Sequence, residues 1–219
     1  MQGSSHDLFG ASPPDTRHER LAPGAWLLRG FALGRATVLM AAIEHITAAA
    51  PFRHLITPGG FRMSVAMTNC GALGWVSDRR GYRYDAHDPL SGRPWPPMPP
   101  VFLELARTAA QVGGFPEFSP DACLLNRYEP GARLTLHQDK DERDFRAPIV
   151  SVSLGLPAIF LFGGDSRKDR PRRVPLQHGD VVVWGGLARL HHHGVLALKD
   201  GHHDLLGAQR LNLTFRRAD

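Results

Sequence analysis

The chain has 219 residues, enough for one domain with its own hydrophobic core. Hydrophobic residues make up 42% of it, which indicates a globular rather than a disordered protein. Lys and Arg outnumber Asp and Glu by 26 to 21, and this positive excess favours polyanionic partners such as nucleic acid. The chain has no apolar stretch long enough to cross a bilayer, and its first 20 residues lack the apolar run of a secretory signal. We therefore expect no membrane association and a cytoplasmic location, with Cys70 and Cys123 as buried thiols.

The first half of the chain predicts a tail, a strand and two helices. Residues 1–20 are polar and show little periodicity, which predicts a flexible N-terminal tail. A short strand is expected over 26–31. Apolar residues at helical spacing predict helices over 34–50 and about 99–112, the first closed by a proline and the second by two glycines.

The segment between the helices, about 57–98, is rich in glycine, proline and aromatic residues. Long ordered segments of this kind in compact domains are often lids or binding loops. A surface cover packed by its own aromatic residues is the alternative interpretation.

From about residue 121 to 217 the pattern changes to short apolar runs separated by glycine, proline and aspartate. Regular short strands with turn signals predict an all-β sandwich or jelly roll. Residues 21–219 are therefore expected to form a single domain that is mainly β with flanking helices. The predicted strands cover 123–128, 133–138, 149–154, 159–162, 181–184, 190–195 and 210–216.

One predicted strand carries a pair of candidate metal ligands, His137 and Asp139, which stand two residues apart and so point the same way. A histidine from a distant strand would complete the 2-His-1-carboxylate triad, which binds Fe(II) and leaves coordination positions open. The histidine triplet that begins at His191 offers such a ligand, but alternation puts His191 and His193 on one face, and the pattern leaves both open. By itself a His-x-Asp pair is more often an ordinary strand feature than a metal site.

The last predicted strand alternates apolar and polar residues. If its apolar face packs on the helices or the second sheet, Arg210, Asn212 and Arg216 point into the barrel. Buried guanidiniums need partners, and a small dicarboxylate fits because Arg binds carboxylates through two hydrogen bonds. A polar outer strand face is the alternative. The first predicted jelly-roll strand adds an amide and a phenol on one face, from Asn126 and Tyr128.

Taken together, these segments resemble the AlkB family of bacterial alkylated-DNA repair dioxygenases. The resemblance extends over about residues 21–217 and is far more specific than a lone facial triad. It is carried by NRYEPGARLTLHQDKD at 126–141, VSVSLG at 150–155, GDVVVWGG at 179–186, HG at 193–194 and RLNLTFR at 210–216. The family's nucleotide-recognition lid is resembled by TPGG at 57–60, MTNCG at 67–71 and GW at 74–75.

This resemblance implies a double-stranded β-helix, another name for the jelly roll, with an N-terminal helical and lid extension. It implies Fe(II) as the metal, with 2-oxoglutarate and O₂ as cosubstrates. The implied reaction is oxidative dealkylation of bases such as 1-methyladenine and 3-methylcytosine, which releases aldehyde, succinate and CO₂. The implied partner is single-stranded or damaged DNA, with RNA as a further candidate, and the chain is expected to act as a monomer.

Site residues are carried over position by position. The implied iron ligands are His137, Asp139 and His193, the last being the histidine that precedes the family's glycine. The implied 2-oxoglutarate residues are Asn126, Tyr128, Arg210, Asn212 and Arg216. Nucleotide contacts are implied for Thr57, Met67, Trp75, Tyr82, Thr135, His137 and Asp141. Among these, the damaged base would lie between Trp75 and His137, Tyr82 would contact a phosphate, and Asp141 would approach the base's amino group.

The chain departs from the family pattern at few positions. His191 and His192 precede the implied ligand, and His191 offers a competing one. Leu211 stands between Arg210 and Asn212, and the basic stretch 167–173 has no role that the resemblance transfers.

Two other functions compete with nucleic-acid dealkylation. One is a 2-oxoglutarate oxygenase of the same fold that acts on a protein or a small molecule. The other is a non-catalytic, nucleic-acid-binding jelly roll in which the histidines hold structural Zn²⁺. A closed structural zinc site usually has four protein ligands, often cysteines, which weighs against the second.

Overall fold

The computed structural model describes residues 17–219. The expected tail lies outside this range up to residue 16. Its last part is a strand, because β1 (His18–Ala22) pairs antiparallel with β2 (Ala25–Leu28). The folded domain therefore begins earlier than the expected boundary at residue 21.

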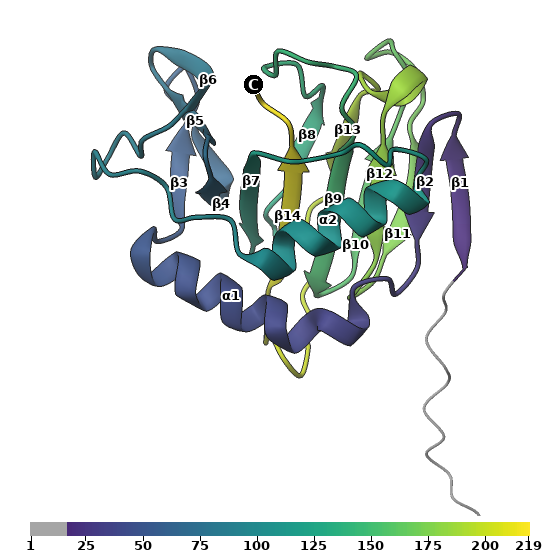
Figure 1. Cartoon of the computed structure of the whole chain (residues 1–219), viewed down its shortest axis with the longest axis horizontal. Helices are drawn as coiled ribbons and strands as arrows, with labels where there is room; N and C mark the ends of the chain where they lie inside the picture. The colour runs from purple at the N-terminus through teal and green to yellow at the C-terminus, as the bar shows by residue number, and fades with distance from the viewer. Residues whose placement is uncertain (1–16) are drawn as a thin grey trace, which may run out of the picture.

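A large antiparallel sheet forms the centre of the molecule (Figure 1). Strand β14 lies in its middle, where it pairs along its length with one neighbour on each side. The strand order is β1-β2-β12-β9-β14-β7-β4-β3. The remaining members are β12 (Val181–Trp184), β9 (Ile149–Gly155), β14 (Arg210–Arg216), β7 (Ala122–Tyr128), β4 (Arg62–Gly71) and β3 (Arg53–Ile56).

A second antiparallel sheet, in the order β11-β10-β13-β8, packs against the inner face of the first through a shared hydrophobic core. Strand β11 was not predicted, because its exposed arginines look like a basic surface stretch and only Val174 and Leu176 are buried. The four strands are β11 (Arg172–Leu176), β10 (Ala158–Phe162), β13 (His193–Val195) and β8 (Leu134–His137).

Two helices, α1 (Ala36–Ala49) and α2 (Pro100–Val112), cover the outer face of the large sheet (Figure 1). Short 3₁₀ turns, η1 (Leu33–Arg35) and η2 (Gly186–Ala188), precede α1 and follow β12. The apolar side of β14 packs under the helices, where the Phe215 ring meets Phe102 edge-on at 5.8 Å. Since side chains alternate along a strand, the polar side of β14 must face the second sheet.

The described residues contain no helix that combines the length and the apolar composition needed to span a membrane.

Part of the segment expected as a lid belongs to the large sheet. Strand β4 belongs to the large sheet, and its residues from Val65 to Cys70 are buried. Its polar residues are satisfied internally: Thr68 Oγ1 donates to the Ala50 carbonyl, and Asn69 Nδ2 donates to the Trp75 carbonyl. What remains outside the large sheet is the turn at 57–61, the loop that follows residue 85, and a separate two-stranded sheet. That sheet is a hairpin of β5 (Gly74–Asp78) and β6 (Gly81–Asp85).

Candidate metal and cosubstrate site

A cavity of about 900 Å³ opens between the large sheet, the second sheet and the β5–β6 hairpin. Its lining comes from strands of both sheets, from the hairpin and from the turn at 57–61. All fourteen residues that the sequence singled out for metal, cosubstrate or base line this one cavity. They are Thr57, Met67, Trp75, Tyr82, Asn126, Tyr128, Thr135, His137, Asp139, Asp141, His193, Arg210, Asn212 and Arg216.

Three of them form a compact set of metal-ligating side chains. His137 and His193 stand opposite each other on the paired strands β8 and β13, and Asp139 lies beside both. One ligand atom from each residue can be chosen so that all three lie within 4.8 Å of one another. The Nε2 atoms of His137 and His193 are 3.7 Å and 3.6 Å from the Asp139 carboxylate oxygens.

The two imidazoles are held in the tautomer that a metal ligand needs. His137 Nδ1 is 2.9 Å from the Thr135 carbonyl, and His193 Nδ1 is 3.0 Å from the His191 carbonyl. Because a carbonyl can only accept, each Nδ1 carries the proton and each Nε2 keeps its lone pair. Hydrogen bonds of this kind fix the orientation of metal-bound histidines.

His191, which alternation left as a rival ligand, lies outside this set. Its ring packs 5.5 Å from Phe162, and its Nε2 is 3.7 Å from Asp165. The predicted strand over 190–195 begins only at His193, so the alternation did not extend back to His191.

Electrostatics place the site in the charge state that a divalent cation requires. Burial, reinforced by the neighbouring His193, lowers the pKa of His137 to about 4. Burial alone would raise the pKa of Asp139, but Arg216 and His193 hold it well below its usual range. The imidazole is therefore neutral and the carboxylate ionised at neutral pH, and both are ready to ligate.

Arg210 provides an unsatisfied cation on the inner wall of the cavity. It is 1% exposed, it donates through Nη2 to Ser153 Oγ at 2.9 Å, and its guanidinium lies 4.8 Å from the Tyr128 ring. Burial lowers the pKa of Arg210. Among the described residues, its Nε and Nη1 have no hydrogen-bond partner. A buried guanidinium with two free donors fits a carboxylate, which 2-oxoglutarate carries at each end.

Arg216, at the other end of β14, is already paired. Its Nε and Nη2 donate to Asp139 Oδ2 at 3.0 Å and 2.7 Å, and Nε lies 3.3 Å from Glu142 Oε1. The carboxylates of Asp139 and Glu142, together with Tyr84, raise the pKa of Arg216 against the opposing effect of burial. Arg216 lines the cosubstrate cavity as expected, but here its first partner is the metal ligand.

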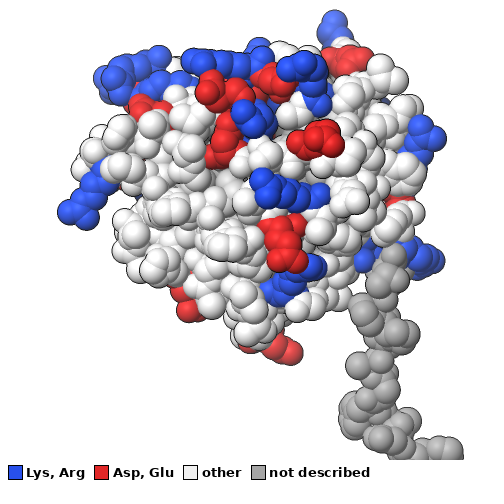
Figure 2. Space-filling model, viewed as in Figure 1, with Lys and Arg blue, Asp and Glu red and all other residues white. Residues whose placement is uncertain are grey.

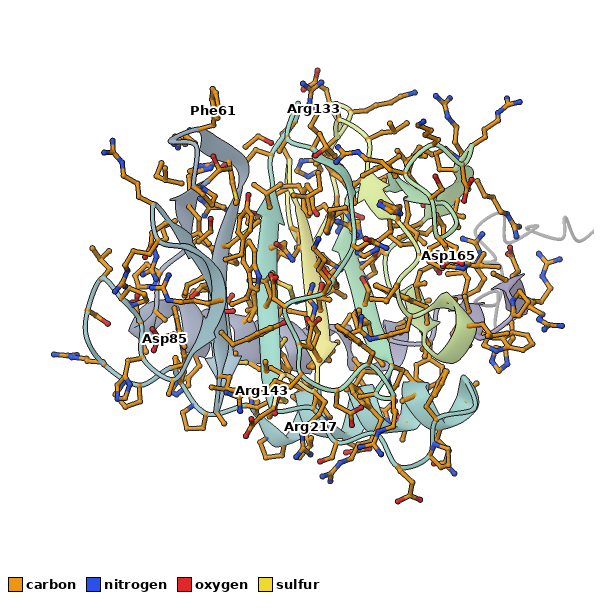
Figure 3. All side chains as sticks on the ribbon, turned by 90° about the horizontal axis from the view of Figure 1, so that it is seen from above. Phe61, Asp85, Arg133, Arg143, Asp165 and Arg217 are labelled. Carbon is orange, nitrogen blue, oxygen red and sulfur yellow. The ribbon has the colours of Figure 1, made fainter. Side chains whose placement is uncertain are left out.

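Aromatic residues form the opposite, outer wall. Trp75 stacks on Tyr82 with ring centroids 5.5 Å apart, and its Nε1 donates to Asp141 Oδ2 at 2.8 Å. Phe61, 76% exposed, closes the tight turn at 57–61 through its N–H bond to Thr57 Oγ1. In Figure 3 Phe61 projects outward from the same edge of the molecule as Arg133.

Several residues of the site were not predicted. Ser151 and Ser153 on β9 bind Asn212 and Arg210, and their alternation within a buried strand was the signal that could have revealed them. Trp184 lies 5.0 Å from the His193 ring. Glu142 lies in a run of charged residues that looks solvent-exposed, yet it is buried behind the metal ligands.

Comparison with known proteins agrees with this geometry. Residues 24–216 match the family described as the 2OG-Fe(II) oxygenase superfamily. The chain is 56% identical over 212 residues to the alpha-ketoglutarate-dependent dioxygenase AlkB of Salmonella typhimurium, which covers 97% of both chains. It is 34% identical over 123 residues to the mouse nucleic acid dioxygenase ALKBH1, which covers 56% of this chain and 31% of that one. The solved structure of OsALKBH1 superposes with a TM-score of 0.81 at 30% identity, covering 92% of this chain and all of that one.

The chain therefore belongs to the 2OG-Fe(II) oxygenase superfamily and, within it, to the bacterial AlkB family. The expected jelly roll with flanking helices is confirmed. The chain is an Fe(II)- and 2-oxoglutarate-dependent dioxygenase that uses O₂ as second cosubstrate.

Proposed function

We propose that this dioxygenase removes alkyl groups from the ring nitrogens of nucleic-acid bases such as 1-methyladenine and 3-methylcytosine, in single-stranded DNA and also in RNA. The observation that carries the proposal is the two-sided cavity. One wall holds three metal-ligating side chains and a buried arginine with two donor nitrogens unsatisfied among the described residues, and the other holds exposed aromatic residues. The names of its relatives, an AlkB dioxygenase and a nucleic acid dioxygenase, support the same substrate class.

We assign the iron to His137, Asp139 and His193, each of which supplies one ligand. When bound, Fe(II) with 2-oxoglutarate and O₂ supplies the oxidation that converts the N-alkyl carbon to a hydroxylated carbon while yielding succinate and CO₂. The hydroxylated carbon then leaves as an aldehyde, and the ring nitrogen is restored. The protein contributes position, charge and exclusion of water.

Arg210 would bind one carboxylate of 2-oxoglutarate, because its Nε and Nη1 have no hydrogen-bond partner among the described residues. The Tyr128 ring keeps this guanidinium in place, and Ser153 fixes its remaining donor. Asn126, which donates to Asn212 Oδ1 across β7 and β14, would present its amide to the same ligand. Asn212, whose Nδ2 donates to Ser151 Oγ and to the Val152 carbonyl, would hold Asn126 in place.

The lid we propose consists of the turn at 57–61 and the β5–β6 hairpin, two of the three parts of 57–98 that stand outside the large sheet. Trp75 and His137 would hold the extruded base between them, with Met67 and Thr135 beside it and Asp141 near its amino group. Base–aromatic stacking contributes roughly 1–3 kcal/mol per base. A base inside a duplex cannot reach the iron, so the enzyme needs single strands or flipped bases.

Exposed basic side chains at the cavity mouth would take up the phosphates. Figure 2 shows further basic side chains, interspersed with acidic ones, along the upper edge of the molecule. Tyr82, 47% exposed, would contact a phosphate beside the lesion. The basic residues that line the cavity and are exposed are Arg62, Arg133, Lys140 and Arg167.

The described residues complete the cavity without a second copy of the chain, and we propose that the enzyme acts as a monomer. We place it in the cytoplasm, where free thiols such as the buried Cys70 and Cys123 persist.

The test is anaerobic loading with Fe(II) and 2-oxoglutarate, then exposure to O₂ with methylated oligonucleotides and mass spectrometry of the products. Loss of the methyl mass with an equal yield of succinate is expected. If no oligonucleotide is demethylated while a peptide or small molecule drives decarboxylation, the nucleic-acid proposal is wrong. If no succinate forms with any substrate, the non-catalytic alternative stands.

A further inference from the structure

Behind the metal ligand Asp139 lies a buried cluster of charged and polar side chains that the reaction described above does not use. Its members are Glu142, Arg189 and Tyr84, which come from the loop after β8, the segment after β12 and the strand β6. Glu142 is 6% exposed and Arg189 is 2% exposed. Charged side chains this deeply buried are rare unless they are paired.

Glu142 is the hub of the cluster. Its Oε1 accepts from the Tyr84 hydroxyl at 2.6 Å and lies 3.3 Å from Arg216 Nε. Its Oε2 accepts from Arg189 Nη2 at 3.1 Å. One carboxylate therefore holds two guanidiniums, and one of these also grips the Asp139 carboxylate.

Arg189 contacts the backbone of the same metal ligand, Asp139. Its Nη1 donates to the Asp139 backbone carbonyl at 2.8 Å, and its Nε donates to the Ala147 carbonyl at 3.0 Å. Asp139 lies beyond the end of β8, which stops at His137, so no strand ladder fixes its backbone. The guanidinium of Arg189 supplies that fixation instead.

Together with Asp139 and Arg216, the charges balance: the carboxylates of Asp139 and Glu142 stand against the guanidiniums of Arg189 and Arg216. If Glu142 lost its charge, Arg216 would keep Asp139 as its only carboxylate and would compete with a metal for the same oxygen. An uncompensated buried cation would also repel an incoming divalent ion.

We propose that Glu142 and Arg189 are positioning residues for the metal: Glu142 restrains Arg216, Arg189 holds the Asp139 backbone, and together they keep one Asp139 oxygen free for the ion. This role rests on the proposed metal site. Residues that orient a ligand from behind typically change metal affinity or activity by about 10–100-fold when they are altered.

The experiment uses Co(II) as an anaerobic spectroscopic substitute for Fe(II) in the full chain. We compare Glu142→Gln, Arg189→Lys, and the control Glu129→Gln, whose carboxylate is exposed and 3.7 Å from Arg127. Co(II) affinity should fall about 10–100-fold in the first two variants, with a shifted visible absorption band, and should stay unchanged in the control. Circular dichroism and the Tm of the metal-free proteins report whether each variant is folded.

The measurements distinguish failure of the positioning role from failure of the metal site. Folded Glu142→Gln and Arg189→Lys proteins with wild-type Co(II) affinity and spectrum would overturn the proposal and leave the cluster a purely structural role. If Glu142→Gln does not fold, Arg189→Lys decides, because it keeps the charge while a lysine ammonium lacks the rigid fork that reaches three acceptors. His137→Ala tests the underlying site, because wild-type Co(II) binding in that variant would refute the metal site rather than the positioning role.

Discussion

The two walls of the cavity are built on opposite principles. The jelly-roll wall, which carries His193, Arg210 and Arg216, is at most 6% exposed at these residues. Hydrogen bonds to the strands and to the loops beside them fix these side chains. The lid wall carries Phe61 and Tyr82, which are 76% and 47% exposed.

Side-chain hydrogen bonds join the two walls. Asn69 on β4 makes two of them with the backbone of Trp75. Trp75 donates to Asp141, and Tyr84 donates to Glu142, so the hairpin rests on the loop after β8 through two side-chain hydrogen bonds. In the roles proposed above, metal and cosubstrate would meet a buried site, whereas the base would meet an exposed surface. Changes to one wall should therefore leave the function of the other largely intact.

The largest effect is expected from substitution of the metal ligands. His137→Ala, Asp139→Ala and His193→Ala should each abolish turnover, because each removes one of three ligands, while binding of a methylated oligonucleotide persists. Succinate release and oligonucleotide binding, measured on the same samples, check this.

His191→Ala and His192→Ala serve as matched controls from the same triplet and should retain turnover. If His191→Ala is inactive while His193→Ala keeps full activity and iron, the ligand assignment is wrong.

The second largest effect is expected from the loss of the buried Arg210 guanidinium. Arg210→Ala should raise the KM for 2-oxoglutarate about 100-fold, since a buried, charge-assisted contact contributes up to roughly 3 kcal/mol and each 1.4 kcal/mol is a factor of ten. Oligonucleotide affinity should change little.

Arg217→Ala, which alters a half-exposed arginine on the same chain segment, is the control and should behave as wild type. Arg210→Lys should not restore the wild-type KM for 2-oxoglutarate, because an ammonium cannot form the two parallel hydrogen bonds of a guanidinium with a carboxylate. A variant that loses oligonucleotide binding but keeps its KM would place Arg210 on the nucleic-acid side.

A substitution in the lid wall should weaken oligonucleotide binding and leave the use of 2-oxoglutarate unchanged. Trp75→Ala removes the stacking surface, and affinity for a methylated oligonucleotide should fall about tenfold, within the roughly 1–3 kcal/mol range of base stacking. Decarboxylation of 2-oxoglutarate without nucleic acid should stay near the wild-type rate.

Trp75→Phe sharpens the comparison, because it keeps an aromatic face but removes the N–H that Asp141 accepts. It should retain most of the affinity. Loss of uncoupled decarboxylation in Trp75→Ala would show that the jelly-roll wall depends on the lid.

The same contrast explains what could be predicted from sequence. Alternation in β14 predicted that Arg210 lies on its polar face and left the direction of that face open, and in β7 it put Asn126 and Tyr128 on one face. The packing of the apolar side of β14 under the helices turns its polar face toward the cavity. Alternation also paired Asp139 with His137, but the strand ends at His137, and Asp139 is held by Arg216 and Arg189 rather than by a strand.

Other features were hidden for physical reasons. Strand β4 looked like a loop because it carries polar residues such as Thr68 and Asn69, whose hydrogen bonds are tertiary. Glu142 looked like a surface charge because its partners Arg189 and Tyr84 are distant in sequence. Hydrogen bonds and ion pairs between residues far apart in sequence decide whether such polar side chains are buried. A local sequence pattern does not reveal these pairs.

The smallest expected effect concerns the charge of the lesion. A base methylated at a pairing ring nitrogen, as in 1-methyladenine or 3-methylcytosine, is cationic at neutral pH. The electron-rich Trp75 face attracts cations, by about 0.5–2 kcal/mol, and the Asp141 carboxylate lies beside that ring. Such lesions also fail to pair, so extrusion costs less than for an intact base. We therefore expect rates several-fold higher on these lesions than on neutral 1-methylguanine, most clearly in single strands. Matched oligonucleotides, single-stranded and duplex, must be compared at one salt concentration, because phosphate contacts make affinity salt-dependent. Asp141→Asn, which keeps the shape but removes the charge, should narrow the difference between cationic and neutral lesions. Equal rates on both lesion types in the wild-type enzyme would show that the lid wall recognises shape and stacking rather than charge.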